Sequence, residues 1–392
     1  MTGTRVGPRG GPVRVLVEDR LAGPVSRRLL LRGFAAVGVG ALAGCASDRA
    51  FAPTAEPDGV VEDRLNVYSW GDYNAPETIT QFRDEFGTEI QMDSFSSNEQ
   101  LIAKLGATRG TSGYDVVVPT GNYIPMMSEN GLLVELDHSL LPDLDNLDPA
   151  YRDQPWDPGN RFSVCKNWGT TGFVYDSTRL TRPMESWEDF LDAATNEASG
   201  SLSILDDPAE ITAIYFAANG IDLNTTREAD FDACEDYLVQ TLAQHITAFT
   251  SNPSLNLVRN DFMLMQSWNG DARSGMLESD TLDKWRFVFP TPTANLWMDN
   301  WSIATGTQRP DAAYALINFM LTPEVGLQEL QYIGYPTGLA GQEELAAEAG
   351  VEFPDLVFPA PDVVKRLTPL EITETQSRIV SITNAMKAKA GS

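Results

Sequence analysis

Cysteine, histidine and basic residues are scarce in this chain, and each shortage argues against a class of function. Its 392 residues include three cysteines and two histidines, without a CxxC pair, so a zinc site has few ligands to draw on. Only 28 lysines and arginines stand against 55 acids, which gives a formal net charge of −27. Such a chain has no phosphate-neutralising surface for nucleic acid and attracts cations instead. Most of these acids are nevertheless expected on solvated faces.

The first 45 residues are predicted to be an export leader. Arg27 and Arg28 precede an apolar run of roughly a dozen residues, which is the length of a signal peptide and too short to span a bilayer. The run ends in Leu-Ala-Gly-Cys, which resembles a bacterial lipobox, and the paired arginines resemble a twin-arginine signal. A buried helix with a chance cysteine is the alternative. We expect export to the outer face of the cytoplasmic membrane or the periplasm, with lipid on Cys45.

Residues 46–64 are polar, contain proline and lack periodicity, so they are predicted to form a flexible tether. Cys165 and Cys234 follow within the body of the chain. Export permits a disulfide between them, and two buried thiols are an equally good interpretation.

From residue 65 onward, segments with strand and helix patterns alternate, which predicts an α/β fold. The length exceeds one ordinary core and favours two lobes. Expected strands or apolar segments cover 65–70, 89–95, 114–120, 167–176, 201–207, 262–268, 285–290 and 297–305. Expected helices cover 76–86, 96–109, 124–131, 186–194, 209–220, 228–246, 310–321 and 324–334.

Aromatic rings and carboxylates recur where expected strands end. In open α/β sheets, ligands bind beyond the carboxyl ends of the strands. Rings there attract a cation by about 0.5–2 kcal/mol each, and carboxylates pair with ammonium groups. Each stretch alone has a structural explanation, as core or helix cap, and their coincidence favours a site for an organic cation. The stretches are Trp70-Gly71-Asp72-Tyr73, Asp206-Asp207 with Glu210, Trp268 with Asp271, Trp297 with Asp299, and Tyr335.

The chain from about residue 65 nearly to its end resembles the bacterial spermidine/putrescine-binding proteins of ABC transporters. The motifs that carry the resemblance are YSWGDY, SFSSNEQLIAKL, YDVVVPT, NWGTTG, LDDPAE, WNGDA, WMDNWSIA, INFML and IGYPT. This resemblance implies a type II periplasmic binding protein fold with the ligand between the lobes. The implied lobes are 65–168 with about 300–345, and about 169–299 with 346–392.

The resemblance also implies roles for individual side chains. Acids would pair with ammonium groups, rings would line the cleft, and hydroxyls would make minor polar contacts. The acids are Asp72, Asp207, Glu210, Asp271 and Asp299, the rings are Trp70, Tyr73, Trp268, Trp297 and Tyr335, and the hydroxyls are Thr120 and Ser251. Asp72 and Asp271 match the putrescine type, so we expect a diamine to bind and spermidine to be tolerated.

Some positions depart from the family pattern. Asn122 stands where spermidine binders often have tyrosine, and Gly71 replaces a serine or threonine. Cys165 and Lys166 replace an apolar or proline–aromatic pair. An ammonium facing the cleft would oppose a polyamine, so we expect Lys166 to point away.

Two other classes of function remain open. Paired acids can perform glycosidase chemistry, but the chain has more acids than one acid and one base require. It also lacks G-x-S-x-G, P-loop and H-E-x-x-H motifs. A binding protein for a sugar, an amino-acid derivative or a metal is the closer alternative. We expect a monomeric binder, not an enzyme, without cofactor, catalytic residue or metal site, whose partners are a polyamine, transporter permease subunits and, through its lipid, the membrane.

Cys45→Ala should release the protein from the membrane or block its maturation. One acyl chain holds a protein weakly, whereas the several chains of a lipoprotein hold it firmly. Membrane fractionation with a high-salt wash measures this, and a variant that stays membrane-bound would refute the lipobox.

Overall fold

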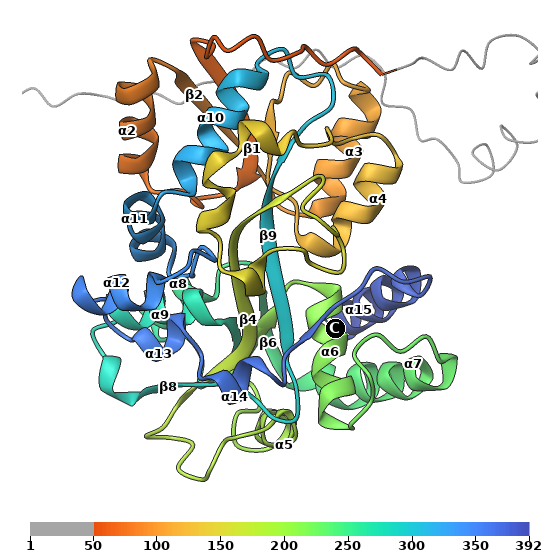
Figure 1. The fold of residues 1–392 in the computed structure, drawn as a ribbon. Coiled ribbons are helices and arrows are strands. Elements are labelled where there is room, and N and C mark those ends of the chain that lie inside the picture. The colour runs from red at the N-terminus through yellow and green to blue at the C-terminus, as the bar shows by residue number, and fades with distance from the viewer. Residues whose placement is uncertain (1–50, 392) are drawn as a thin grey trace, which may run out of the picture. The chain divides into compact units, whose positions relative to one another are not determined.

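The structure, a computed structural model, describes residues 51–391 (Figure 1). The strands are β1 (Arg64–Trp70), β2 (Glu89–Phe95), β3 (Val116–Val117), β4 (Val164–Asp176), β5 (Leu202–Leu205), β6 (Ile246–Thr250), β7 (Leu264–Trp268), β8 (Trp285–Val288), β9 (Asn295–Ile303) and β10 (Thr368–Pro369). The helices are α2 (Pro76–Phe86), α3 (Asn98–Thr108), α4 (Ile124–Glu129), α5 (Trp187–Thr195), α6 (Pro208–Ala218), α7 (Glu228–Glu235), α8 (Pro253–Arg259), α9 (Asn269–Glu278), α10 (Pro310–Met320), α11 (Pro323–Ile333), α12 (Gln342–Glu348), α13 (Pro354–Val357), α14 (Pro361–Val364) and α15 (Gln376–Ala390). The predicted α/β class is confirmed.

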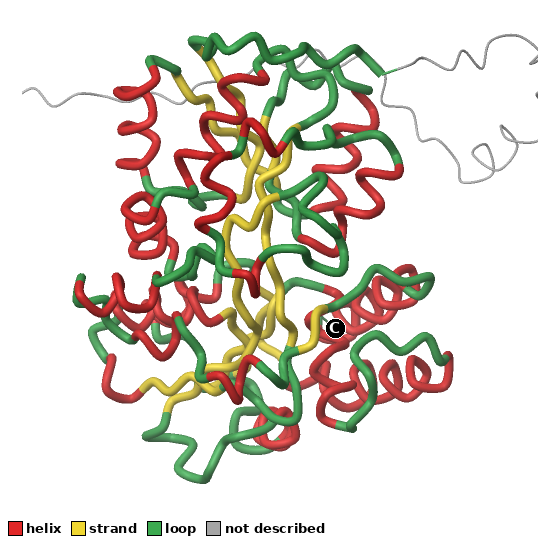
Figure 2. Tube along the Cα trace, in the orientation of Figure 1, coloured by secondary structure: helices red, strands yellow, loops and turns green. Residues whose placement is uncertain are grey.

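Strands run through the middle of the described region, with helices on either side (Figure 2). Their order is β2-β1-β3-β9-β4-β7-β5-β6, with β10 beside β9 and β8 beside β4. β1 pairs in parallel with β2 and β3, whereas β9 is antiparallel to β3 and β4. β4 and β9 are the long strands that run between the upper and lower halves of the view in Figure 1.

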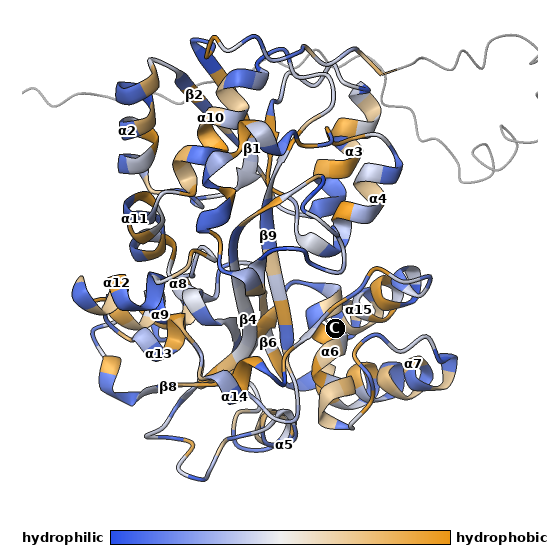
Figure 3. Ribbon diagram, in the orientation of Figure 1, coloured by the Kyte–Doolittle hydropathy of each residue, from blue (hydrophilic) through white to orange (hydrophobic). Residues whose placement is uncertain are grey.

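The two-lobed fold has separate hydrophobic cores above and below the middle of these strands. One large cluster of buried side chains draws on residues 65–168 and again on 298–339. The other draws on residues 173–294 and adds Ile382 and Met386 from α15. The helices carry both apolar and polar residues along their length, as expected where one face packs on a core (Figure 3).

Several helix starts follow from local sequence. Pro76 occupies the first turn of α2, where its missing N–H has no intrahelical partner to lose. The Ser97 side chain accepts a hydrogen bond from the Gln100 N–H at the start of α3, while the Gln100 side-chain carbonyl oxygen accepts from the Ser96 N–H. α5 begins with a complete capping box between Ser186 and Asp189.

The long helix predicted over 228–246 is α-helical only in its first half. α7 ends at Glu235, and the chain stays helical as a π-helix over Asp236–Leu242 and a 3₁₀ turn over Ala243–His245. Of the predicted range only Ile246 joins the sheet, where β6 pairs in parallel with β5. Helices α8, α9 and α12–α15 lie outside the segments predicted to be helical.

The start of the described region is held against the body by hydrogen bonds. The Ala52 N–H donates to Arg109 O, and the Asp58 and Gly59 N–H groups donate to the Asp311 carboxylate at the start of α10. This part of the predicted tether is therefore bound to the body, because its backbone finds donors and acceptors there. Cys45 and the leader lie outside the described residues.

Cys165 and Cys234 are buried free thiols in different core clusters, so they do not pair. Within residues 51–391, none of the helices combines the length and apolar character that crossing a membrane requires.

Candidate binding site

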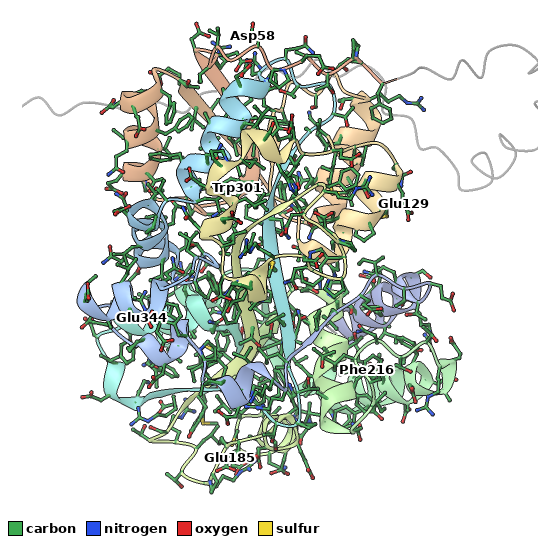
Figure 4. The ribbon with its side chains drawn as sticks, in the orientation of Figure 1. Asp58, Glu129, Glu185, Phe216, Trp301 and Glu344 are labelled. Carbon is green, nitrogen blue, oxygen red and sulfur yellow. The ribbon has the colours of Figure 1, made fainter. Side chains whose placement is uncertain are left out.

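β4 and β9 form the centre of the candidate site. Their antiparallel register places Asn167 opposite Asp299 and Gly169 opposite Trp297. Because side chains alternate along a strand, Trp297 and Asp299 project from the same face of β9. The same strand contains the buried Trp301, which lies in the upper half of the view in Figure 4.

Asp299 is 5% exposed and is held by two hydroxyl groups from distant segments. The Thr120 Oγ1 donates to Oδ1 at 2.7 Å, and the Tyr73 hydroxyl donates to Oδ2 at 2.8 Å. Tyr73 follows β1 and Thr120 follows β3, so the ends of two neighbouring strands converge on one carboxylate. Burial raises the pKa of Asp299 to about 6, despite these hydrogen bonds and the nearby Lys166 charge.

A second acid pair lies at the start of α6. The Asp207 Oδ1 caps the helix by accepting from the N–H groups of Ala209 and Glu210 at 2.9 and 3.1 Å. Thr171 Oγ1 and Asn295 Nδ2 donate to Glu210 Oε1 at 2.8 and 2.7 Å. Burial, followed by the Asp207 charge, raises the pKa of Glu210, and burial also raises the pKa of Asp207.

Asp271, the fourth acid, is paired with an aromatic hydroxyl. The Tyr335 hydroxyl donates to Asp271 Oδ2 at 2.7 Å, and burial raises the pKa of Asp271 to about 6. The Tyr335 ring meets Trp297 edge-on, with centroids 4.8 Å apart. A Cβ on Gly270 would lie 2.5 Å from the Tyr335 ring, and one on Gly169 would lie 2.4 Å from the Trp297 ring. These two glycines therefore allow both rings to approach the backbone.

Residues from the two halves influence one another electrostatically. Burial raises the pKa of Tyr73 well above its ordinary value, and the carboxylates of Asp299 and Asp271 raise it further. The pKa of Asp207 is raised mainly by burial and also by Glu99, which lies in the first turn of α3 on the other side. The predicted acids Asp207, Glu210, Asp271 and Asp299 are hereafter called the site acids. Glu210 accepts from Thr171 of β4 and Asn295 of β9, the two strands whose pairing also places Asp299.

The remaining predicted residues differ in their surroundings. Trp268 is half-buried at the end of β7, opposite Thr171. Trp70 is half-buried and packs on Phe95 with ring centroids 4.6 Å apart, so it contributes to a core. Asp72 and Ser251 are exposed, and neither is drawn into the hydrogen-bonded network around the site acids.

Sequence reasoning missed the amides and hydroxyls that orient the predicted side chains. Asn98 donates to Thr120 Oγ1 at 3.0 Å, and fully buried Asn167 donates to the Tyr73 hydroxyl at 2.7 Å. Polar residues inside an apolar strand, such as those of NWGTTG, are the sequence feature that could have indicated these residues.

Lys166, which we expected to point away, is buried with its ammonium beneath the Tyr73 ring, 4.3 Å from the centroid.

The site acids lack basic partners. None of the ion pairs found within residues 51–391 includes any of them. Burying a carboxylate without a cation is costly, which is why the pKa values rise. The arrangement suits a ligand that brings positive charge and apolar length between rings.

Comparisons with known proteins agree on one family. A family model described as bacterial extracellular solute-binding protein matches residues 77–351. The chain is 29% identical to spermidine/putrescine-binding periplasmic protein 1 of Haemophilus influenzae over 83% of this chain and 88% of that protein. It is 32% identical to the spermidine/putrescine-binding periplasmic protein of Salmonella typhimurium over 82% and 87% of the two chains.

A solved structure extends this likeness to the fold. The substrate-binding protein of a spermidine/putrescine ABC transporter from Streptococcus pneumoniae aligns with a TM-score of 0.72 and 30% identity. The alignment covers 84% of this chain and 100% of that one.

Raising the pH should destabilise the ligand-free protein. The carboxyls of Asp271 and Asp299 have folded-state pKa values of about 6, above the unfolded value of about 4. Their protonation therefore stabilises the fold fully below about pH 4, and this contribution is lost as pH rises through about 6. The raised pKa of Asp299 alone corresponds to a loss of about 3 kcal/mol in the free energy of unfolding between these pH limits.

Thermal melts without ligand between about pH 4.5 and 7.5 measure this effect. Asp299→Asn should flatten the fall in melting temperature, because the amide does not titrate. A melting temperature that rises steadily across this range would contradict the raised pKa values.

Proposed function

The chain belongs to the family of bacterial extracellular solute-binding proteins, and we propose that it captures a polyamine, putrescine or spermidine, for an ABC importer. The observation that carries this proposal is the set of site acids, of which Glu210 and Asp299 are buried and Asp207 and Asp271 half-buried, without a basic partner within the described residues. A polyamine supplies the missing ammonium groups together with methylenes that rings can cover. The names of the relatives in Haemophilus influenzae and Salmonella typhimurium support the same ligand class.

Each part of the site has a role in this proposal. Asp299 pairs with one ammonium group while Tyr73 and Thr120 fix its orientation. An ionised carboxylate has about four lone-pair sites, so two hydroxyl donors leave room for an ammonium. The Oδ1 of Asn167 accepts no hydrogen bond within the described residues and provides a further acceptor for an N–H group. At the other acids, Asp207, Glu210 and Asp271 pair with the remaining positive charge.

Rings complete the proposed ligand contacts. Trp297 and Tyr335 meet edge-on beside Asp271, and Trp268 ends β7 immediately before α9, whose first turn contains Asp271. Such rings cover methylenes and add cation–π attraction. The family pattern also proposes the exposed Asp72 and Ser251 and the half-buried Trp70. These three side chains would contact the ligand from the edge of the site.

We propose that the ligand is the counter-charge that closes the two lobes. The lobes are 65–168 with about 300–345, and about 169–299 with 346–392, and the separate hydrophobic clusters support these boundaries. Because the chain passes between them more than once, rotation about β4 and β9 would bring Tyr73, Glu99 and Thr120 of the first lobe against the site acids, all of which lie in the second lobe. Without a cation, charge repulsion and desolvation oppose that closure.

The proposal also includes location and partners. The relatives named above are periplasmic. We propose that this chain is exported, anchored through lipid on Cys45, and delivers its ligand as a monomer to the permease subunits of the importer. The site acids act as fixed charges in this proposal, so no catalytic step and no cofactor is assigned to them.

Calorimetric titration should give binding of putrescine and spermidine and no comparable binding of maltose or Ca²⁺. A sugar lacks the charge that the site acids need. Within residues 51–391, His, Cys, Asp and Glu side chains do not gather in a group of three that would suit a metal ion. Heat signals for maltose or Ca²⁺ alone would overturn the polyamine proposal in favour of that solute.

Asp299→Asn should weaken amine binding by about 2–5 kcal/mol, because an enclosed ammonium loses its charge partner while the shape of the side chain is kept. The loss should appear mainly as faster release and should change little with salt, since a buried pair is poorly screened. Titration and stopped-flow release measure it. Asp261→Asn, which removes an exposed acid, is the matched control. Equal affinities in the two variants would place the ammonium elsewhere.

A further inference from the structure

Lys166 occupies an irregular position in β4, directly beside the candidate site. The pairing of β4 with β9 proceeds from Cys165–Asn300 to Asn167–Asp299, so Lys166 is an extra residue without a partner in the β9 register. Such a bulge redirects a side chain and locally bends the strand. Here it accompanies a lysine whose side chain is 2% exposed.

The Lys166 ammonium is surrounded by electron-rich groups. Its Nζ donates to the Tyr73 carbonyl oxygen at 2.7 Å and lies 3.7 Å from Glu329 Oε2. It also lies over two rings, 4.3 Å from the Tyr73 centroid and 5.1 Å from the Trp301 centroid. Burial lowers the pKa of Lys166, and the nearby carboxylates of Glu329 and Asp299 act against this shift. The carbonyl and the two ring faces also favour the charged form.

Glu329 completes a neutral pair and holds the same loop. Its Oε1 accepts from the Ala75 N–H at 2.9 Å, and its Oε2 accepts from Asn74 Nδ2 at 2.8 Å. Lys166 and Glu329 therefore bind three consecutive residues, from Tyr73 to Ala75. This loop presents the Tyr73 hydroxyl to Asp299.

The charge of Lys166 also reaches the ligand-binding carboxylate. It acts against the burial that raises the pKa of Asp299. The Lys166 ammonium thus covers one face of the Tyr73 ring. Its positive charge also offsets part of the negative charge with which Asp299 would attract a ligand ammonium. A second ligand ammonium at this end would face a fixed like charge in a region of low dielectric.

We infer that Lys166, held by Glu329, is a selectivity residue that limits the Asp299 end of the site to a single ligand ammonium and so favours a diamine over a longer triamine. This inference rests on the proposed polyamine function. It assigns a role to Lys166, which is not one of the residues proposed to contact the ligand.

Lys166→Met combined with Glu329→Gln tests the inference. Methionine keeps the length of the side chain, and the pair is removed without leaving a single buried charge. The new amide at position 329 can still accept from the Ala75 N–H through its oxygen and can donate to the Asn74 Oδ1, which has no hydrogen bond within the described residues. Of the two charges removed, Lys166 is the one that acts on Asp299, so the ratio of the putrescine Kd to the spermidine Kd should rise about tenfold as this like charge is lost.

Lys284→Met with Asp176→Asn is the matched control. This pair, 2.9 Å apart, is also largely buried, and Lys284 lies 4.3 Å from the Trp285 ring centroid. The control should leave the Kd ratio unchanged. Should the first double variant fail to fold, Lys166→Gln, which keeps a donor for the Tyr73 carbonyl, should shift the ratio in the same direction.

The outcomes are distinguishable. The inference is overturned if the Kd ratio of putrescine to spermidine does not change in the Lys166 and Glu329 double variant, whether both affinities stay the same or fall equally. The pair would then have only a structural role. The same ratio shift in the control would also overturn it. Wild-type protein that binds neither amine would overturn the proposed function and this inference with it.

Discussion

Carboxylates buried without a cation dominate the energetics of the region where β4 and β9 join the two halves. Hydroxyl and amide donors orient Asp299 and Glu210, yet burial still raises the pKa of each. Hydrogen bonds from neutral donors thus compensate only part of the desolvation cost. The closed arrangement therefore needs protons or an external cation. In the function proposed above, capture of a polyamine and closure of the lobes meet the same electrostatic requirement.

The surrounding framework holds these charges at fixed positions. Strand ends bring Tyr73 and Thr120 to Asp299, and glycines at 169 and 270 let bulky rings pack against the backbone. Fixed donors and rings do not need to reorganise when the ligand arrives, which reduces the entropic cost of binding. The separate cores above and below give each set of residues its own rigid support.

Lys166 shows how the same chemistry can shape selectivity. Its ammonium has the partners that a ligand ammonium would seek: a ring, a carbonyl and a carboxylate. Since this cation belongs to the protein, it cannot be exchanged for part of a ligand. A binding site for cations that contains a permanent cation discriminates by charge spacing as well as by total charge.

The sequence by itself determined the alternation of strands and helices, the starts of helices such as Pro76–Phe86 and the chemical character of the site, because periodicity, caps and residue type are local properties. It predicted Asp299 as a site residue through its aromatic neighbours. Only the tertiary structure decided that Asn98 and Asn167 orient the site and that Lys166 is buried within a bulge. These depend on strand register and on partners far away in the chain. A shift of one residue reverses which face a side chain occupies, and no local pattern records that choice.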